Sequence, residues 1–404
     1  MSTSLLYHTW GIRGYTYIHT RYDKGCTFFR VEQEELSLRS ACCGSREVNK
    51  RGASERTFKT TPVGNRPIFI ELPVQRVECL ECGVVRQVNV PFAQPRRSYT
   101  KGFERYALDL SRHMTIQDVA HHLNVSWDTI KDIQKRYLHR RFNKPKLGKL
   151  KRIAIDEIYL GSRSGYLTVV MDLNSGAVIE VAEGKQAAAL DPFWKRLKHS
   201  RAQVEAVAMD MGPAYIKAVR ENLPEATLVF DHFHVIKLYN DKLTKLRRAV
   251  AKEADVLGKK ALKGTRWLLM KTPANLVVDK DEHTRLQEAL QLNQPLATAY
   301  YLKDDLRRVW QQEDKEAAAF LLDDWIKRAA VSGIQMLKQF ANTLAAYRSG
   351  ILAYYDFDRL STGPLEGTNN KIKTLQKMAY GFRDKEFLKL KIKGLHETKY
   401  ALVG

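Results

Sequence analysis

The sequence has no uninterrupted apolar run approaching the ~20 residues that a membrane-spanning helix needs. Residues 1–25 also lack the basic-then-apolar order of a secretory signal peptide. Cysteine is scarce and odd in number, and all of it occurs early in the chain, as Cys26, Cys42, Cys43, Cys79 and Cys82. These absences argue against a membrane protein or a disulfide-stabilised secreted protein. We therefore expect a cytoplasmic protein whose cysteines are thiols or metal ligands.

Acidic residues are also in short supply. The 404 residues include 67 Lys and Arg but only 45 Asp and Glu, which leaves a formal net charge of +22. A surplus of this size predicts a polyanionic partner. Nucleic acid is the first candidate, and a membrane surface is the alternative. The length is sufficient for two or three domains.

Composition divides the chain into regions. Residues 1–97 are rich in strand-like runs broken by Gly, Pro and Asn, and residues 98–140 are predicted to be helical. The stretch 135–152 contains nine Lys or Arg and no acid, so we expect residues 141–152 to form an exposed basic linker. From residue 235 to residue 355 the pattern is almost wholly helical.

Between these regions, residues 153–234 alternate between strand and helix. Short apolar runs predict buried strands, and Asn174-Ser175-Gly176 predicts the turn of a hairpin. The predicted order is strand 153–160, hairpin 165–184, helix 189–200, strand 204–210, helix 212–223 and strand 226–231. This order predicts an α/β fold in which a mixed sheet is flanked by helices.

Three carboxylates are candidates for chemistry. Asp156 lies within the first strand, Asp210 ends a later strand, and Glu366 begins the last helical region. Carboxylates among apolar strand residues are costly to bury unless they are paired or bound to a metal. If the three converge, they could hold two Mg²⁺ (or Mn²⁺) ions for an in-line phosphoryl displacement. Each acid could instead cap a helix or a turn, and Glu157 and Asp231 are rival carboxylates.

Residues 114–138 have the spacing of a helix-turn-helix. Ile116, Val119, Ala120 and Leu123 form one apolar face, Asn124-Val125 makes the turn, and Ile130 and Ile133 face inward from the second helix. Ser126 is predicted to cap that helix. Its exposed start, which enters the major groove in such motifs, carries three candidate DNA-binding residues, Trp127, Thr129 and Lys131. The alternative is an ordinary helical hairpin.

Longer motifs resemble a known family. The segments "IAIDEIYLG", "AVAMDMGPAY", "VFDHFHVIKL", "KGTRWLL" and "STGPLEGTNNKIKTLQKMAYGFRD" are similar to those of bacterial insertion-sequence transposases of the L-three family. Those proteins are DDE transposases with a ribonuclease-H-like catalytic core. The resemblance extends over nearly the whole chain. It implies a core formed by residues 153–234 and 356–404, with residues 235–355 as an all-helical insertion.

By position, the resemblance makes Asp156, Asp210 and Glu366 the catalytic metal ligands. It implies that Asp231 and His234, in "DHFH", support the site; for His234 the alternative is an ordinary core histidine. It also implies a set of DNA contacts beside Glu366 and in the insertion. These are Asn369, Asn370, Lys371, Lys373, Arg266 and Trp267. A tryptophan on a helix more often belongs to a core, which is the alternative for Trp267.

A possible zinc site lies in the first region. Cys79-x-x-Cys82-Gly83 is half of a zinc-ribbon pattern. The family pairs this half with an earlier C-x-x-C-G, but here Ser40 stands where the first cysteine would be, followed by Cys42 and Cys43. Either Cys42 substitutes as a ligand, which gives Cys42, Cys43, Cys79 and Cys82, or the site is incomplete. Cys26 has no partner at useful spacing.

The leading hypothesis is therefore a transposase that binds terminal inverted repeats, cleaves DNA and joins 3′-OH ends to target DNA. We expect it to act on double-stranded DNA as a homodimer or larger homo-oligomer, in the cytoplasm with the nucleoid and away from membranes. Two alternatives stay open at this point. One is a non-enzymatic, sequence-specific DNA-binding regulator whose acids are structural, and the other is a ribonuclease-H-like nuclease.

Overall fold

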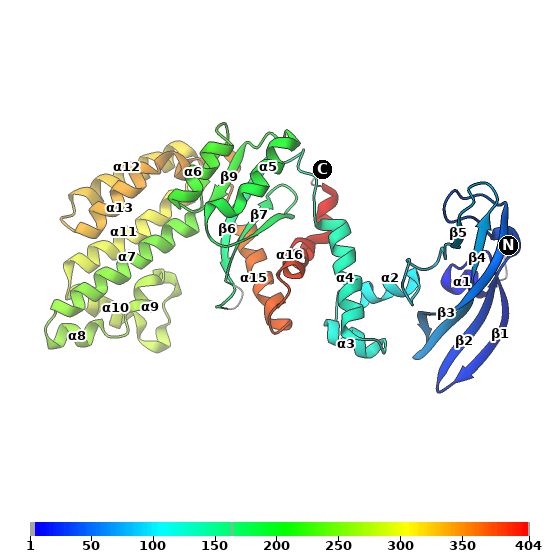
Figure 1. Cartoon of the computed structure of the whole chain (residues 1–404). Helices are drawn as coiled ribbons and strands as arrows, with labels where there is room; N and C mark the ends of the chain where they lie inside the picture. The colour runs from blue at the N-terminus through cyan, green and yellow to red at the C-terminus, as the bar shows by residue number, and fades with distance from the viewer. Residues whose placement is uncertain (1–4, 163–164, 403–404) are drawn as a thin grey trace. The chain divides into compact units, whose positions relative to one another are not determined.

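The computed structural model describes residues 5–162 and 165–402, and the chain forms two compact units, residues 1–140 and 141–404 (Figure 1). Each unit has a hydrophobic core of its own. Within the described residues, every helix is too short or too polar to cross a lipid bilayer.

The first unit begins with a β-sheet, as the sequence predicts. A short helix, α1 (Leu5–Trp10), precedes strands β1 (Tyr15–Asp23), β2 (Cys26–Gln33), β3 (Val48–Val63), β4 (Arg66–Cys79) and β5 (Val85–Gln87), with a 3-10 turn at Glu35–Ser37. The sheet order is β1-β2-β4-β3, and β5 pairs with β4. β3 and β4 form one long antiparallel hairpin. Its inward face buries Phe58, Ile70 and Leu72 almost completely, which supplies the core of this sheet.

A helix-turn-helix follows in the same unit. α2 (Lys101–Leu110), α3 (Ile116–His122) and α4 (Trp127–Phe142) enclose a cluster that includes Val119, Ala120, Leu123, Ile130 and Ile133. These are the residues that the spacing predicts to face inward. Asn124 adopts the left-handed conformation at the turn (φ 48°), and the Ser126 hydroxyl accepts the Thr129 N–H at 3.2 Å as the predicted cap of α4.

A lysine joins the helix-turn-helix to the sheet. Lys59 of β3 donates from Nζ to the carbonyl oxygens of Leu123 (2.6 Å) and Asn124 (2.7 Å), at the turn itself. Burial lowers the pKa of Lys59. Thr100, which caps α2, donates from its hydroxyl to Thr60 at 3.1 Å. The turn is therefore held by polar contacts to β3 as well as by its own apolar cluster.

The second unit contains the predicted mixed sheet. Its strands are β6 (Arg152–Tyr159), β7 (Tyr166–Asp172), β8 (Val178–Glu183), β9 (Ala206–Met209) and β10 (Thr227–Phe230), in the order β10-β9-β6-β7-β8. β6, β9 and β10 are parallel to one another, and β7 is antiparallel to both of its neighbours. The β7–β8 hairpin turns at the predicted residues. The ribonuclease-H-like fold class is thereby confirmed.

Helices cover both faces of this sheet (Figure 1). On one face, α5 (Asp191–Ser200) and α6 (Pro213–Asn222) pack with Ile153 and Ile155 of β6 in a large core. On the other face, α15 (Gly363–Met378) and α16 (Lys385–Lys393) pack with Ala154 and Ile158 of the same strand. Successive residues of β6 therefore point alternately to the two helical layers.

Between β10 and α15 the chain is helical, as predicted. The helices are α7 (His232–Glu253), α8 (Val256–Leu262), α9 (Arg266–Met270), α10 (Glu282–Gln291), α11 (Gln294–Arg308), α12 (Lys315–Val331), α13 (Gln335–Ala346) and α14 (Arg348–Leu352). Short 3-10 segments connect several of these helices, and another 3-10 segment, Gly394–Leu402, follows α16. Aromatic side chains fill the centre, where the rings of Tyr239 and Phe340 lie 5.1 Å apart and Trp325 is fully buried. This insertion therefore has a packed interior.

The sequence predicts that the basic segment before β6, residues 141–152, is an exposed linker, but the structure buries part of it. α4 extends to Phe142, which is fully buried, and Leu147 and Leu150 are buried in the core beneath the sheet. The apolar side chains between the lysines account for the difference, because their burial fixes the backbone while the charged side chains stay at the surface.

The contact between α14 and β10 leaves no room for a side chain at Gly350. A methyl group on Gly350 would overlap the Phe230 ring and lie 3.2 Å from the Leu228 carbonyl oxygen. We expect Gly350→Ala to lower the free energy of unfolding by roughly 1–3 kcal/mol, measured by urea denaturation. Gly367→Ala is the control, because the space around Gly367 in α15 is open, and it should be neutral or slightly stabilising. Equal stabilities of the two variants would contradict this packing.

Candidate functional site

Three aspartates form one row across the parallel strands. Ala154 of β6 pairs with Ala208 of β9, so continuing the register places Asp156 opposite Asp210. Phe230 of β10 pairs with Met209, and the same continuation places Asp231 beside Asp210. Neighbouring strands lie about 4.8 Å apart, so these three residues occupy adjacent positions across the sheet. The row lies where β9 and β10 end.

Strand alternation separates Asp156 from its rival Glu157. Asp156 has the same parity as Ala154 and Ile158, which face the layer that contains α15. Glu157 has the opposite parity and interacts with Tyr215 of α6 on the other face. Only the first of these two acids therefore lies on the same side as Glu366.

The Asp156 carboxylate is held from two directions. Oδ2 accepts the Nδ2–H of Asn369 in α15 at 2.7 Å, and Oδ1 accepts the backbone N–H of Glu157 at 2.8 Å. Burial raises the pKa of Asp156, and the negative charge of Asp210 raises it further, whereas His234 and Lys237 oppose the rise. The half-buried Asp156 carboxylate therefore lies within the electrostatic influence of the exposed Asp210.

Asp231 has a structural task. It is buried, and its Oδ1 accepts the Phe233 N–H at 2.6 Å as the N-cap of α7. Its Oδ2 accepts both the N–H and the hydroxyl of Thr362, each at 2.6 Å, immediately before α15. Both carboxylate oxygens are thus engaged in fixing two helices, which favours Asp210 over Asp231 as a metal ligand.

Glu366 occupies the first turn of α15 and is exposed. It precedes Asn369 by three residues, so the two lie on neighbouring positions of one helix face. Asn369 itself is buried, and its side chain is bonded to Asp156. Asn370, Lys371 and Lys373 are exposed beyond it. The expected phosphate contacts are therefore available at these three residues, while Asn369 faces the carboxylate.

His234 lies in the first turn of α7, half-buried and close enough to Asp156 to lower the pKa of that carboxyl. This position is compatible with the expected supporting role, which stays a prediction.

The donor set of this row suits a divalent cation. The half-buried Asp156 and the exposed Asp210 influence each other, and Asn369 Oδ1 is a buried polar atom that lacks a protein partner among the described residues. Asp156 and Asp210 offer the hard oxygen ligands that Mg²⁺ and Mn²⁺ bind. A cation would favour the charged form of Asp156, which burial and, to a smaller extent, the charge of Asp210 disfavour.

Trp267 is at the surface of the insertion. Its side chain is 63% exposed, and the Arg266 guanidinium lies 4.8 Å from the ring centroid. The alternative of a core tryptophan is therefore wrong. α9, which carries both residues, is fixed at its other end by the fully buried Lys303, whose Nζ donates to the carbonyl oxygens of Leu269 (2.6 Å) and Lys271 (2.8 Å).

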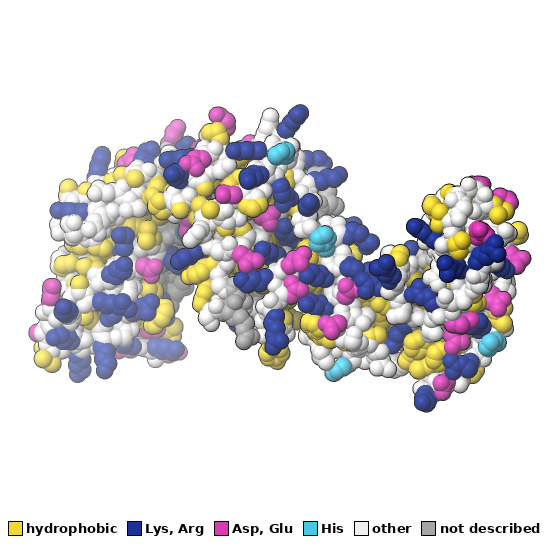
Figure 2. Space-filling view, in the orientation of Figure 1, with side chains coloured by type: hydrophobic (Ala, Val, Ile, Leu, Met, Phe, Trp, Pro, Cys, Tyr) yellow, Lys and Arg dark blue, Asp and Glu magenta, His cyan; other side chains and the backbone are white. Residues whose placement is uncertain are grey.

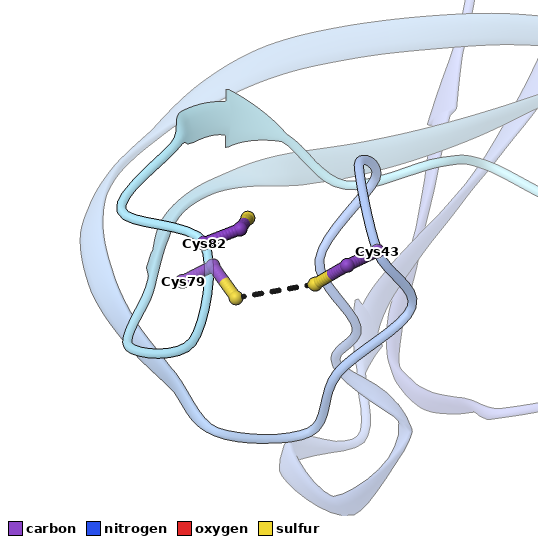
Figure 3. A group of neighbouring side chains, drawn as sticks. All are labelled: Cys43, Cys79 and Cys82. Carbon is purple, nitrogen blue, oxygen red and sulfur yellow. Dashed lines mark hydrogen bonds between the residues drawn. The ribbon is translucent and has the colours of Figure 1, made fainter.

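A cluster of thiols lies in the first unit (Figure 3). The sulfur atoms of Cys43, Cys79 and Cys82 all lie within 4.8 Å of one another. Among the described residues, these three side chains are the group of His, Cys, Asp or Glu that is close enough together to hold a metal ion. The Sγ atoms of Cys43 and Cys79 are 3.4 Å apart. Hydrogen bonding by backbone N–H groups lowers the pKa of Cys79 to about 7. Cys42 is exposed and outside the group.

At the start of α4, the predicted recognition residue Trp127 is exposed, while Thr129 and Lys131 are half-buried. Trp127 is 42% exposed, and Lys131 Nζ lies 5.3 Å from its ring centroid. The Thr129 hydroxyl is 2.9 Å from that of Ser126. Figure 2 shows lysine and arginine side chains spread over the visible face of both units, as expected for a chain that attracts polyanions.

Sequence patterns did not identify three of the residues that position these groups. Asn369 is predicted to contact phosphates, Thr362 lies in a quoted motif without a predicted role, and Lys303 lies in no motif. A polar residue beside a helix start is the only local signal for Thr362, and its partner is 131 residues away.

This geometry, with a row of acids on a ribonuclease-H-like sheet, is that of a DDE transposase core. The transposase model of the ISL3 family matches residues 153–392. The "Helix-turn-helix domain of transposase family ISL3" matches residues 88–138, and the "zinc-finger of transposase IS204/IS1001/IS1096/IS1165" matches residues 41–82. The chain belongs to the ISL3 family of insertion-sequence transposases.

Two relatives of known name are also transposases of insertion sequence elements. The chain is 31% identical over 355 residues to the transposase for insertion sequence element IS1001 of Bordetella parapertussis, covering 87% of each. It is 30% identical over 365 residues to the transposase for insertion sequence element IS1557 of Mycobacterium tuberculosis, covering 84% of this chain and 81% of that one. A structure of the Drosophila P element transposase strand transfer complex is similar at a TM-score of 0.38 and 11% identity, over 74% of this chain and 92% of that one.

Loss of charge at Asp231 and at Asp210 should change the free energy of unfolding by different amounts. Asp231→Asn would turn an amide N–H toward the Thr362 N–H and hydroxyl, so we expect a loss of roughly 2–4 kcal/mol in the free energy of unfolding. Asp210→Asn should change it by less than about 0.5 kcal/mol, since Asp210 is exposed and bonds only locally, to the Gly212 N–H. Thermal or urea denaturation of both variants measures the difference. Comparable losses would show that Asp231 does not anchor α15.

Proposed function

We propose that this transposase binds the terminal inverted repeats of its element, cleaves there and joins the freed 3′-OH ends to target DNA. Asp156, Asp210 and Glu366 act as the metal-binding triad. The observation that carries the proposal is the joining of α15 to the aspartate row, through Asn369 to Asp156 and through Thr362 to Asp231.

Each residue then has a definite task. Asp156 and Asp210 lie on the sheet, and Glu366 lies in the first turn of α15, the helix that Asn369 and Thr362 join to the aspartates. These three carboxylates would hold divalent cations, which would supply positive charge to the attacking and leaving oxygens of phosphoryl transfer. Asn369 orients the Asp156 carboxylate, and His234 adds positive character beside it. Asn370, Lys371 and Lys373 bind DNA phosphates along the exposed side of α15.

Recognition is assigned to other segments. We propose that residues 98–140 read the terminal repeats through Trp127, Thr129 and Lys131 at the start of α4. Within residues 1–97, Cys43, Cys79 and Cys82 hold a zinc ion. Residues 153–234 and 356–404 form the catalytic core, and in the insertion, residues 235–355, Trp267 stacks on an unpaired base with Arg266 beside it. Two copies of the chain, or more, bring the two ends of the element together.

Loss of one triad charge should abolish chemistry but not binding. Glu366→Gln, Asp156→Asn and Asp210→Asn should each slow cleavage of a labelled terminal-repeat duplex by at least about a hundredfold, because a lost ligand removes several kcal/mol of transition-state stabilisation. The losses should not add in double variants, since the three groups act as one unit. Gel shift of the same duplex should be unchanged.

Glu157→Gln is the matched control. It removes a carboxylate adjacent to Asp156 but on the opposite face of the sheet, and cleavage should fall less than about tenfold. Near-normal cleavage by Glu366→Gln would show that this glutamate is an ordinary helix-start acid. Cleavage without joining of 3′-OH ends to a target would instead favour a nuclease.

Recognition should depend on the start of α4. Ala substitutions of Trp127 and Lys131 should weaken binding to the terminal repeat by roughly 1–3 kcal/mol and binding to random duplex by less, in a titration at fixed salt. Arg105→Ala removes an exposed cation from α2, so it should weaken binding to the terminal repeat and to random duplex to the same extent. Equal losses on both duplexes for the α4 variants would exclude a base-reading role.

A further inference from the structure

Two turns in the first unit have the same backbone. Gly44 donates to the Ser40 carbonyl at 3.0 Å, and Gly83 donates to the Cys79 carbonyl at 2.9 Å. In the reverse direction, the Ser40 N–H donates to the Ser45 carbonyl at 2.9 Å, and the Cys79 N–H donates to the Val84 carbonyl at 3.1 Å. Both glycines have positive φ, 79° and 67°. Residue by residue, Ser40 is therefore the counterpart of Cys79.

The side chains of Ser40 and Cys79 follow the same correspondence. Both are buried, at 5% and 1% exposure. The Ser40 Oγ accepts the backbone N–H two residues later, from Cys42, at 3.3 Å. The Cys79 sulfur likewise accepts the backbone N–H two residues later, from Glu81. The Ser40 Oγ also lies 3.9 Å from Cys82 Sγ, so the hydroxyl borders the thiol cluster.

Cys42 has a different counterpart. It corresponds to Glu81, and both residues are exposed. Its backbone N–H is directed to Ser40, while its thiol lies outside the group formed by Cys43, Cys79 and Cys82. By this correspondence, Cys42 does not occupy a position equivalent to Cys79 or Cys82, the two cysteines of the second turn.

Zinc in structural sites is nearly always four-coordinate, so three thiolates leave one corner to fill. We propose that this chain binds zinc through Cys43, Cys79 and Cys82, with the Ser40 hydroxyl at the fourth corner and Cys42 uninvolved. The inference rests on the zinc binding proposed above and concerns only its ligand set. An oxygen at this corner leaves the site one negative charge short of a four-thiolate site. Zinc should therefore be held less tightly than four cysteines would hold it.

The test compares metal binding by the full-length chain and four variants, with Zn²⁺ in competition with a chromophoric chelator and Co²⁺ as a spectroscopic probe. Ser40→Cys should raise zinc affinity at least about tenfold, because binding strength follows the number of thiolates. It should also strengthen the sulfur-to-cobalt charge-transfer band. Cys42→Ala should leave both measurements unchanged. Cys79→Ser should lose the metal, and Ser40→Ala should weaken its binding.

Each outcome separates the possibilities. A loss of affinity and of the charge-transfer band in Cys42→Ala would identify Cys42 as the fourth ligand and overturn the proposal. An unchanged affinity in both Ser40→Cys and Ser40→Ala would also overturn it. If the parent chain takes up neither metal, the zinc site itself fails along with its ligand set. If only Cys79→Ser loses the metal, three-thiolate binding stands without Ser40.

Discussion

The hydrogen bonds that Thr362 donates to Asp231 determine where the last part of the catalytic unit lies. The helical insertion separates these two residues by 131 positions, so chain connectivity alone does not fix the start of α15. The buried carboxylate accepts two bonds from Thr362 while it caps α7, and a buried charge that loses such partners is costly. Because Glu366 and Asn369 follow within two turns, the position of both depends on this contact. In the sequence feature "DHFH", Asp231 thus has an architectural role, and His234 is close enough to Asp156 to lower the pKa of that carboxyl.

Local periodicity was enough to predict much of this arrangement. The short apolar run of residues 153–160 predicts the strand that carries Asp156 and Glu157 but leaves the two acids as rivals, and two further short apolar runs that end in aspartate give Asp210 and Asp231 their places at strand ends. Parallel pairing then aligns the three aspartates without any side-chain detail. The helix-turn-helix was equally accessible, since Val119, Leu123, Ile130 and Ile133 form its core at the spacing that helices require.

Other features depend on contacts that no pattern carries. Nothing in "EGTNNKIK" distinguishes Asn369, which turns inward to Asp156, from Asn370, which is exposed; only the docking of α15 on the sheet decides between them. The segment 141–152 was expected to be exposed because its charge dominates, yet Leu147 and Leu150 reach the core. Spacing also left Ser40 and Cys42 as competing candidates, and the matching turns at Gly44 and Gly83 distinguish them.

The electrostatics of the chain agree with the proposal that recognition and chemistry use separate segments. Under that proposal, a net charge of +22 would draw DNA to the surface without regard to sequence, whereas the aspartate row would repel phosphate until bound cations neutralised it. Burial that raises the pKa of Asp156 adds to the cost of leaving that row uncompensated. Helix α4 carries its candidate contacts on a separate unit, so its binding to DNA need not wait for the metal. Under the proposed function, such a chain would hold its DNA end before cations bind, and the carboxylates would then limit cleavage to complexes that contain both DNA and cations.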